Sequence, residues 1–159
     1  MSKILLTGGF GYIGTHIASL LSEQDKEFLI YDNFSNCQKT IIKRLDKLIG
    51  KKVQFINGDI RDTSKLIDTI KQNNIFSVIH LAALKSIEES SINPIEYYDV
   101  NINGTISLLK AMQFSNVKNL LFSSSATIYG EPKYLPINEM HPLQAINPYG
   151  ETKLTVENI

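Results

Sequence analysis

The sequence predicts an α/β fold, a doubly wound parallel sheet with helices on both faces. Short β-branched runs alternate with helical segments, a glycine-rich turn joins the first strand to the first helix, and an aspartate follows the second strand. Strands are expected at 3–7, 28–31, 52–57, 76–81 and 117–124, and helices at Gly11–Gln24, Lys39–Ile49, Thr63–Gln72 and Pro94–Phe114. Residues 1–159 are expected to form one domain.

The first strand leads into the stretch TGGFGYIG, Thr7 to Gly14, and an amphipathic segment follows it. Glycine permits a tight turn off the strand, the approach of backbone N–H groups to a pyrophosphate, and close packing of helix on sheet. The helix N-terminus then faces the anion. A glycine turn alone is weak evidence, because such turns are common. The strand before it and the helix after it favour a Rossmann-type dinucleotide site.

Asp32 ends the second apolar run and lies about twenty residues beyond the glycines, as in dinucleotide-binding folds. A carboxylate there can accept both hydroxyls of an adenosine ribose and repels a 2′-phosphate. No arginine follows it closely, so NAD is favoured over NADP. The alternative is a solvated aspartate in an ordinary turn.

Two later strands also end in residues suited to a ligand. Asp59 follows the third strand, where its carboxylate could accept the adenine amino group, whereas Asp62 is expected to cap the helix that begins at Thr63. Ala82 and Ala83 follow the fourth strand, and small side chains let a flat ligand lie close to the backbone.

The composition excludes several classes of function. Lys+Arg and Asp+Glu number 16 each, so a formal net charge of +0 gives no field that would attract nucleic acid or an anionic membrane. Cys37 is the single cysteine and the three histidines share no ligand spacing, so neither a metal site nor a disulfide is expected. Without a signal peptide or a long apolar run, we expect a reducing, cytoplasmic setting and a small-molecule or protein partner.

Hydroxyl-bearing residues follow the fifth strand, and Tyr149 and Lys153 lie four residues apart beyond them. On a helix this spacing puts an ammonium one turn from a phenol, where its charge favours the phenolate and makes tyrosine a usable base. A serine hydroxyl opposite can share the substrate proton. A YxxxK motif alone is weak evidence for a catalytic tyrosine. Together with a dinucleotide-binding loop and a serine cluster upstream, it specifically indicates one.

The segments TGGFGYIG, GDIRD, HLAALKSIEES, FSSSATIYG and NPYGETK resemble the extended short-chain dehydrogenase/reductase family, and within it the UDP-glucose 4-epimerase group, over essentially the whole chain. The resemblance implies NAD as cofactor and a UDP-hexose as substrate, with transient oxidation at the sugar C4 and hydride return to the other face. It implies Ser125, Tyr149 and Lys153 as catalytic residues, with Ser124, Ser125 and Lys85 near the substrate. The implied cofactor contacts are Gly8, Gly11, Tyr12, Ile13, Gly14, Asp32, Asn33, Asn36, Asp59, Ile60, Leu81, Ala82, Ala83, Lys85, Tyr149 and Lys153.

Some features depart from the family pattern or leave alternatives open. Val100 stands where related epimerases often have asparagine, and Cys37 where they often have serine. Related 4,6-dehydratases usually carry an Asp-Glu pair where Ala126–Thr127 stand here, which favours an epimerase over a dehydratase or decarboxylase. The family's substrate domain would follow residue 159, so an inactive NAD-binding fragment is another reading. The apolar excess of Pro94–Phe114 suggests a homodimer.

Overall fold

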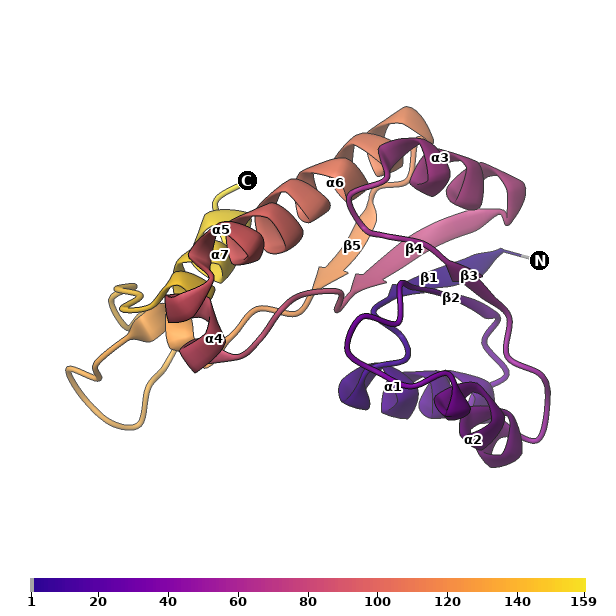
Figure 1. Cartoon of the computed structure of the whole chain (residues 1–159), viewed down its shortest axis with the longest axis horizontal. Coiled ribbons are helices and arrows are strands. Elements are labelled where there is room, and N and C mark those ends of the chain that lie inside the picture. Colours follow the sequence, from indigo (N-terminus) through magenta and orange to yellow (C-terminus); the bar gives the residue numbers. More distant parts are fainter. Residues whose placement is uncertain (1) are drawn as a thin grey trace. The chain divides into compact units, whose positions relative to one another are not determined.

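A parallel sheet of five strands, in the order β3-β2-β1-β4-β5, organises the structure (Figure 1), a computed structural model that describes residues 2–159. Its strands are β1 (Lys3–Thr7), β2 (Phe28–Asp32), β3 (Phe55–Asn57), β4 (Ile75–His80) and β5 (Asn119–Phe122). All four pairings are parallel. The predicted fold class is therefore confirmed. β3 is shorter than predicted because Val53 N–H donates to Asp46 Oδ1 at 2.8 Å instead of to a neighbouring strand.

The chain divides into two compact units. The first unit comprises the described residues up to Ala82 together with Ile106–Ser123, and the second unit comprises Ala83–Thr105 and Ser124–Ile159. The boundary thus falls once directly after β4, once within a helix, and once after β5.

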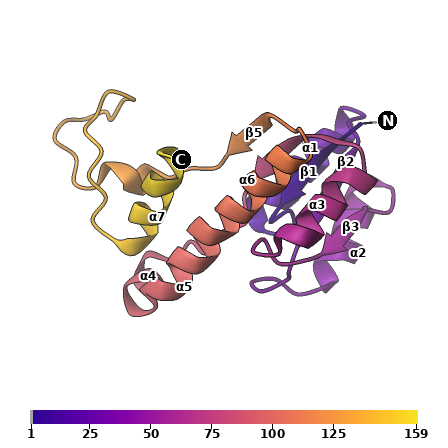
Figure 2. The ribbon, with the colours of Figure 1, turned by 90° about the horizontal axis from the view of Figure 1, so that it is seen from above.

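The first unit holds the sheet between two layers of helices. Helices α1 (Tyr12–Glu23) and α2 (Thr40–Ile49) cover one face, while α3 (Thr63–Gln72) and α6 (Gly104–Phe114) cover the other (Figures 1 and 2). All five residues of β2 are buried, as expected for a strand covered on both faces. The core beneath α1 and α2 consists of Leu6, Phe10, Ala18, Phe28, Ile30, Leu45 and Val53.

The second unit is mainly helical. It contains α4 (Ile87–Ile92), α5 (Pro94–Tyr97), the π-helix η1 (Tyr98–Asn103), the 3-10 turn η2 (Ala126–Tyr129) and α7 (Pro148–Glu157). Helix α7 packs against the other four of these elements. The helix predicted from Pro94 to Phe114 has the predicted ends, but residues Tyr98–Asn103 within it adopt the wider π-helical geometry. Throughout residues 2–159, no helix has the length and apolar character needed to cross a membrane.

Candidate functional site

The glycine turn of the first unit requires glycine at two positions. Gly8 has a φ of +67°, and a Cβ on it would lie 2.7 Å from the backbone nitrogen of Ala82. A Cβ on Gly14 would lie 2.6 Å from the carbonyl oxygen of Gly8. Any side chain at either position would push the turn away from β4 or lift α1 off the turn. These two glycines therefore fix where the N-terminus of α1 lies.

The N-terminus of α1 has the properties of an anion site. Gly11 occupies the N-cap position without a side-chain cap, and the first turn contains no acidic residue. The first backbone N–H groups of a helix lack intrahelical partners and carry partial positive charge. Tyr12 and Ile13, the first two helical residues, are 77% and 55% exposed. A phosphate group therefore fits this turn, as the sequence predicted.

Asp32 is fixed at the end of β2 by two backbone hydrogen bonds. Phe10 N–H donates to its Oδ2 at 3.0 Å and Phe34 N–H donates to its Oδ1 at 2.8 Å. The residue is only 7% exposed, so it is not a solvated turn aspartate. Each carboxylate oxygen retains a further lone pair, which suits two neighbouring ribose hydroxyls.

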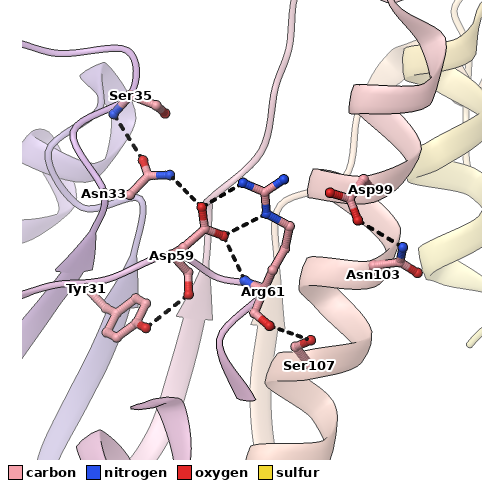
Figure 3. A network of polar contacts seen from close by, with 8 residues as sticks. All are labelled: Tyr31, Asn33, Ser35, Asp59, Arg61, Asp99, Asn103 and Ser107. Atoms are coloured by element: carbon pink, nitrogen blue, oxygen red, sulfur yellow. Dashed lines mark hydrogen bonds and ion pairs between the residues drawn. The ribbon is translucent and has the colours of Figure 1, made fainter. Parts of the chain in front are cut away.

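Asp59 lies in a polar network at the end of β3 (Figure 3). Tyr31 donates its hydroxyl proton to the Asp59 backbone carbonyl at 3.0 Å, and the Asp59 carboxylate accepts from Asn33 and Arg61. The hydrogen bonds from the Arg61 guanidinium hold the pKa of Asp59 well below its usual range. Asp62 accepts from Lys65 N–H at 3.0 Å, so its predicted role as the cap of α3 is confirmed.

The other predicted cofactor contacts of the first unit follow the ends of β2, β3 and β4. Asn36 is exposed in the segment after β2, whereas Ile60 is buried beside Asp59. Leu81 and Ala82 continue β4, and their N–H groups donate to Thr7 O at 3.1 Å and to Thr7 Oγ1 at 3.4 Å. A contact that the sequence analysis missed, Thr7 Oγ1 to His80 Nδ1 at 2.7 Å, joins the same strand ends.

In the second unit, Asn101 ties the segment that contains Ala83 and Lys85 to helix α7. Its Oδ1 accepts from Leu84 N–H at 2.8 Å, and its Nδ2 donates to Leu84 O and to Thr152 Oγ1, both at 3.0 Å. The sequence analysis considered its neighbour Val100 and missed Asn101. A partial signal was present, because Asn101 lies between the apolar Val100 and Ile102 and a buried asparagine needs hydrogen-bond partners.

Tyr149 and Lys153 lie one turn apart in α7, as predicted. Asn147 caps this helix by accepting from Gly150 N–H at 2.8 Å. Lys153 Nζ is 5.9 Å from the centroid of the Tyr149 ring. The lysine is only 4% exposed, and burial lowers the pKa of Lys153 to about 8.

The ring of Tyr149 is held edge to face by Tyr97, with centroids 6.5 Å apart and planes at 82°. Tyr97 is itself fully buried, and its hydroxyl accepts from Ser86 N–H at 2.9 Å and donates to Glu89 Oε2 at 3.0 Å. These contacts restrict the orientation of the phenol. The sequence analysis considered only the apolar excess of the segment from Pro94 to Phe114 and did not anticipate this packing.

The second unit also contains the hydroxyl groups of Ser124 and Ser125. Ser125 Oγ caps η2, accepting from Thr127 N–H at 3.2 Å and from the Thr127 hydroxyl at 2.9 Å. Both acceptor positions of Ser125 are thereby used, and its own O–H remains as a donor. Ser124 Oγ is buried and has no hydrogen-bond partner within residues 2–159. The second unit thus contains a phenol, a buried cation and two hydroxyls, which together suit proton transfer.

Comparisons with known proteins find similar sequences over nearly the whole chain. The family model described as GDP-mannose 4,6 dehydratase matches residues 5–159. A UDP-glucose 4-epimerase from Dictyostelium discoideum is 47% identical over 157 residues, which are 99% of this chain and 46% of that protein.

Two solved structures have a backbone fold similar to that of this chain. A UDP-glucose 4-epimerase from Stenotrophomonas maltophila with bound NAD and formylated UDP-arabinopyranose has a TM-score of 0.96 at 40% identity, with 99% of this chain and 47% of that chain covered. A UDP-glucose 4-epimerase from Bifidobacterium longum in complex with NAD+ and UDP has a TM-score of 0.95 at 43% identity, with 99% and 47% covered. The chain therefore spans about half the length of the relatives it matches.

Proposed function

This chain belongs to the family described as GDP-mannose 4,6 dehydratase, and from that membership we propose that it is the NAD-binding part of a UDP-hexose 4-epimerase. The observation that carries the proposal is the buried Lys153 one helical turn from Tyr149. The names of the similar proteins support epimerisation over other reactions of the family.

NAD is the proposed cofactor, and the residues present fit it. The uncapped N-terminus of α1 suits the pyrophosphate, and the fixed carboxylate of Asp32 suits the adenosine ribose. The NAD that accompanies the two similar crystal structures supports the same assignment. When bound, NAD supplies an acceptor for the hydride of the sugar C4 and returns that hydride later.

The chain's own residues would handle the proton. The Tyr149 phenolate takes the proton of the C4 hydroxyl while the C4–H bond breaks, so that C4 becomes a ketone. The charge of Lys153 stabilises the phenolate, and the O–H of Ser125 can donate to the C4 oxygen. After the 4-keto sugar turns over, Tyr149 returns the proton and the opposite C4 configuration forms.

Two alternatives differ from this proposal in specific features. A 4,6-dehydratase needs further acid and base groups to remove water, and Ala126 and Thr127 stand where related dehydratases usually carry Asp and Glu. A non-catalytic NAD-binding fragment would keep the glycine turn and Asp32 but turn over no sugar.

A homodimer is also proposed, from the apolar surface of the second unit. Ile92, Ile95 and Tyr98 are exposed on α4, α5 and η1. Isolated exposed apolar residues are common, but three on consecutive elements suit a protein interface. Analytical ultracentrifugation tests this directly, and a monomer at high protein concentration would contradict it.

Two measurements test the proposed function. Calorimetric titration of the chain with NAD and NADP should show binding that favours NAD. Chromatographic assay of UDP-galactose conversion by a protein extended to the full length of its relatives, with Tyr149→Phe as the matched variant, tests epimerisation. NAD binding without conversion would support the non-catalytic alternative, and failure to bind NAD would refute both.

A further inference from the structure

All acceptor positions of the Asp59 carboxylate are filled by donors of the first unit (Figure 3). Arg61 N–H and Nε both donate to Oδ1 at 2.9 Å. Arg61 Nη2 donates to Oδ2 at 2.8 Å, and Asn33 Nδ2 donates to the same oxygen at 3.2 Å. A carboxylate offers about four lone-pair positions. An adenine amino group can therefore reach this carboxylate only by replacing a donor that is already present.

The four donors are not equally easy to replace. Three belong to Arg61, whose side chain forms a charge-assisted, bidentate pair with Asp59. The fourth is the neutral amide of Asn33, and its hydrogen bond is the longest of the set. Asn33 is exposed, so water can solvate the amide once it is released. Asn33 is therefore the donor that a ligand would displace.

The position of the Asn33 amide is set by its own turn. Asn33 Oδ1 accepts from Ser35 N–H at 3.0 Å, which closes an Asx turn after β2. This bond directs Nδ2 toward Asp59, which lies at the end of the neighbouring strand β3. The amide thus presents an N–H to Asp59.

We propose that Asn33 holds the acceptor position that the adenine amino group would take, and that Asn33 thereby determines how strongly this chain distinguishes adenine from a 6-oxopurine. The inference rests on the proposed binding of NAD. Adenine would exchange one N–H donor for another, so its amino group would add little to affinity. A 6-oxopurine has a carbonyl at that position, and Asn33 can keep its bond to Asp59 and shield the carboxylate from that oxygen.

Removing the amide should therefore sharpen the selectivity for adenine. In Asn33→Ala, one lone pair of Asp59 would be free to accept from adenine, and the same charge would repel the carbonyl of hypoxanthine. The measured quantity is the Kd for nicotinamide hypoxanthine dinucleotide divided by the Kd for NAD. The two ligands have the same riboses, pyrophosphate and nicotinamide and differ only at the purine 6-position and at N1, which carries a hydrogen in hypoxanthine. Any loss of a ribose contact through Asn33 therefore cancels in this ratio.

Isothermal titration calorimetry of the 159-residue chain with the two dinucleotides gives the ratio. We expect wild type to discriminate by about threefold or less, and Asn33→Ala to raise the ratio by about tenfold, the scale of one hydrogen bond to a charged acceptor. Asn33→Ser retains an oxygen acceptor for Ser35 N–H and should also raise the ratio, which guards against a disordered loop. Asn36→Ala, in the same segment, should change both dissociation constants by the same factor.

A double-mutant comparison isolates the carboxylate. In an Asp59→Ala background, Asn33→Ala should leave the ratio unchanged, because the acceptor has gone. An unchanged ratio in both Asn33→Ala and Asn33→Ser, with NAD still bound, would overturn this inference and leave the proposed cofactor intact. Failure of wild type to bind either dinucleotide would overturn the proposed cofactor and this inference together.

Discussion

The two units of this chain treat their charged groups in opposite ways. In the first unit, the carboxylates of Asp32 and Asp59 accept hydrogen bonds from backbone N–H groups and from Arg61. In the second unit, by contrast, burial disfavours the charge on Lys153. We expect a ligand-binding site to be fully compensated in advance, whereas the site proposed for proton transfer holds a lysine at a place where burial disfavours its charge.

The comparison predicts that the largest effect on turnover lies in the second unit. In a protein extended to the full length of its relatives, Tyr149→Phe should lower epimerase turnover by about 10²- to 10⁴-fold, the usual contribution of a general base. NAD binding should persist, because only the proton-transfer group is lost. Steady-state assay together with calorimetry checks both statements, and near-normal turnover would mean that another residue is the base.

Burial of the charged Lys153 side chain should reduce the stability of the folded chain at neutral pH. Its folded pKa of about 8 lies below the ordinary 10.5, so the unfolded chain binds the extra proton between these values. Stability should therefore rise with pH from about 8 to 10.5, and below pH 8 the penalty is fully present. Lys153→Met should remove a penalty of about 3 kcal/mol at pH 7.

Urea denaturation of wild type and Lys153→Met at pH 7 and near pH 10 measures this effect. The stability gap between the two proteins should be smaller at the higher pH. Lys110→Met, which replaces an exposed lysine on α6, is the matched control and should show little gap at either pH. A gap for Lys153→Met that does not change with pH would contradict the prediction.

Asn101 tests how far the second unit depends on a single buried side chain. Asn101→Ala would leave Leu84 N–H and O and the Thr152 hydroxyl without this partner, and should destabilise the chain by about 2–3 kcal/mol. Asn103→Ala, at an exposed position in the same π-helix, should have little effect. Equal denaturation midpoints for the two variants would show that the hydrogen bonds of Asn101 do not stabilise the chain.

Asp32 provides the smaller effect expected in the first unit. Asp32→Ala should weaken NAD binding by roughly 1–3 kcal/mol, the range for losing hydrogen bonds to a charged acceptor. Calorimetry measures the loss, with Asp68→Ala, an exposed aspartate on α3, as the control. An unchanged NAD affinity in Asp32→Ala would show that this carboxylate does not bind the ribose.

Most secondary structure was predictable because its signals are local. β1 and α3 have the predicted bounds, and α3 begins where Asp62 caps it. Helix α4 was not predicted, since its six residues are too short for a clear helical period. The π-helical geometry of Tyr98–Asn103 was also missed, because no residue pattern in the segment distinguishes it from an α-helix.

The sequence by itself determined the glycine turn, the aspartate at the end of β2 and the Tyr149–Lys153 spacing, because each depends on neighbours along one strand or one helix turn. Only the tertiary structure decided that Asn101 meets Thr152, 51 residues away, and that Thr7 meets His80, 73 residues away. The tertiary structure also decided that Lys153 is buried and that the Asn33 amide donates a hydrogen bond to the Asp59 carboxylate. The physical reason is that each such contact contributes only about 1 kcal/mol and requires segments that the rest of the fold has already brought together.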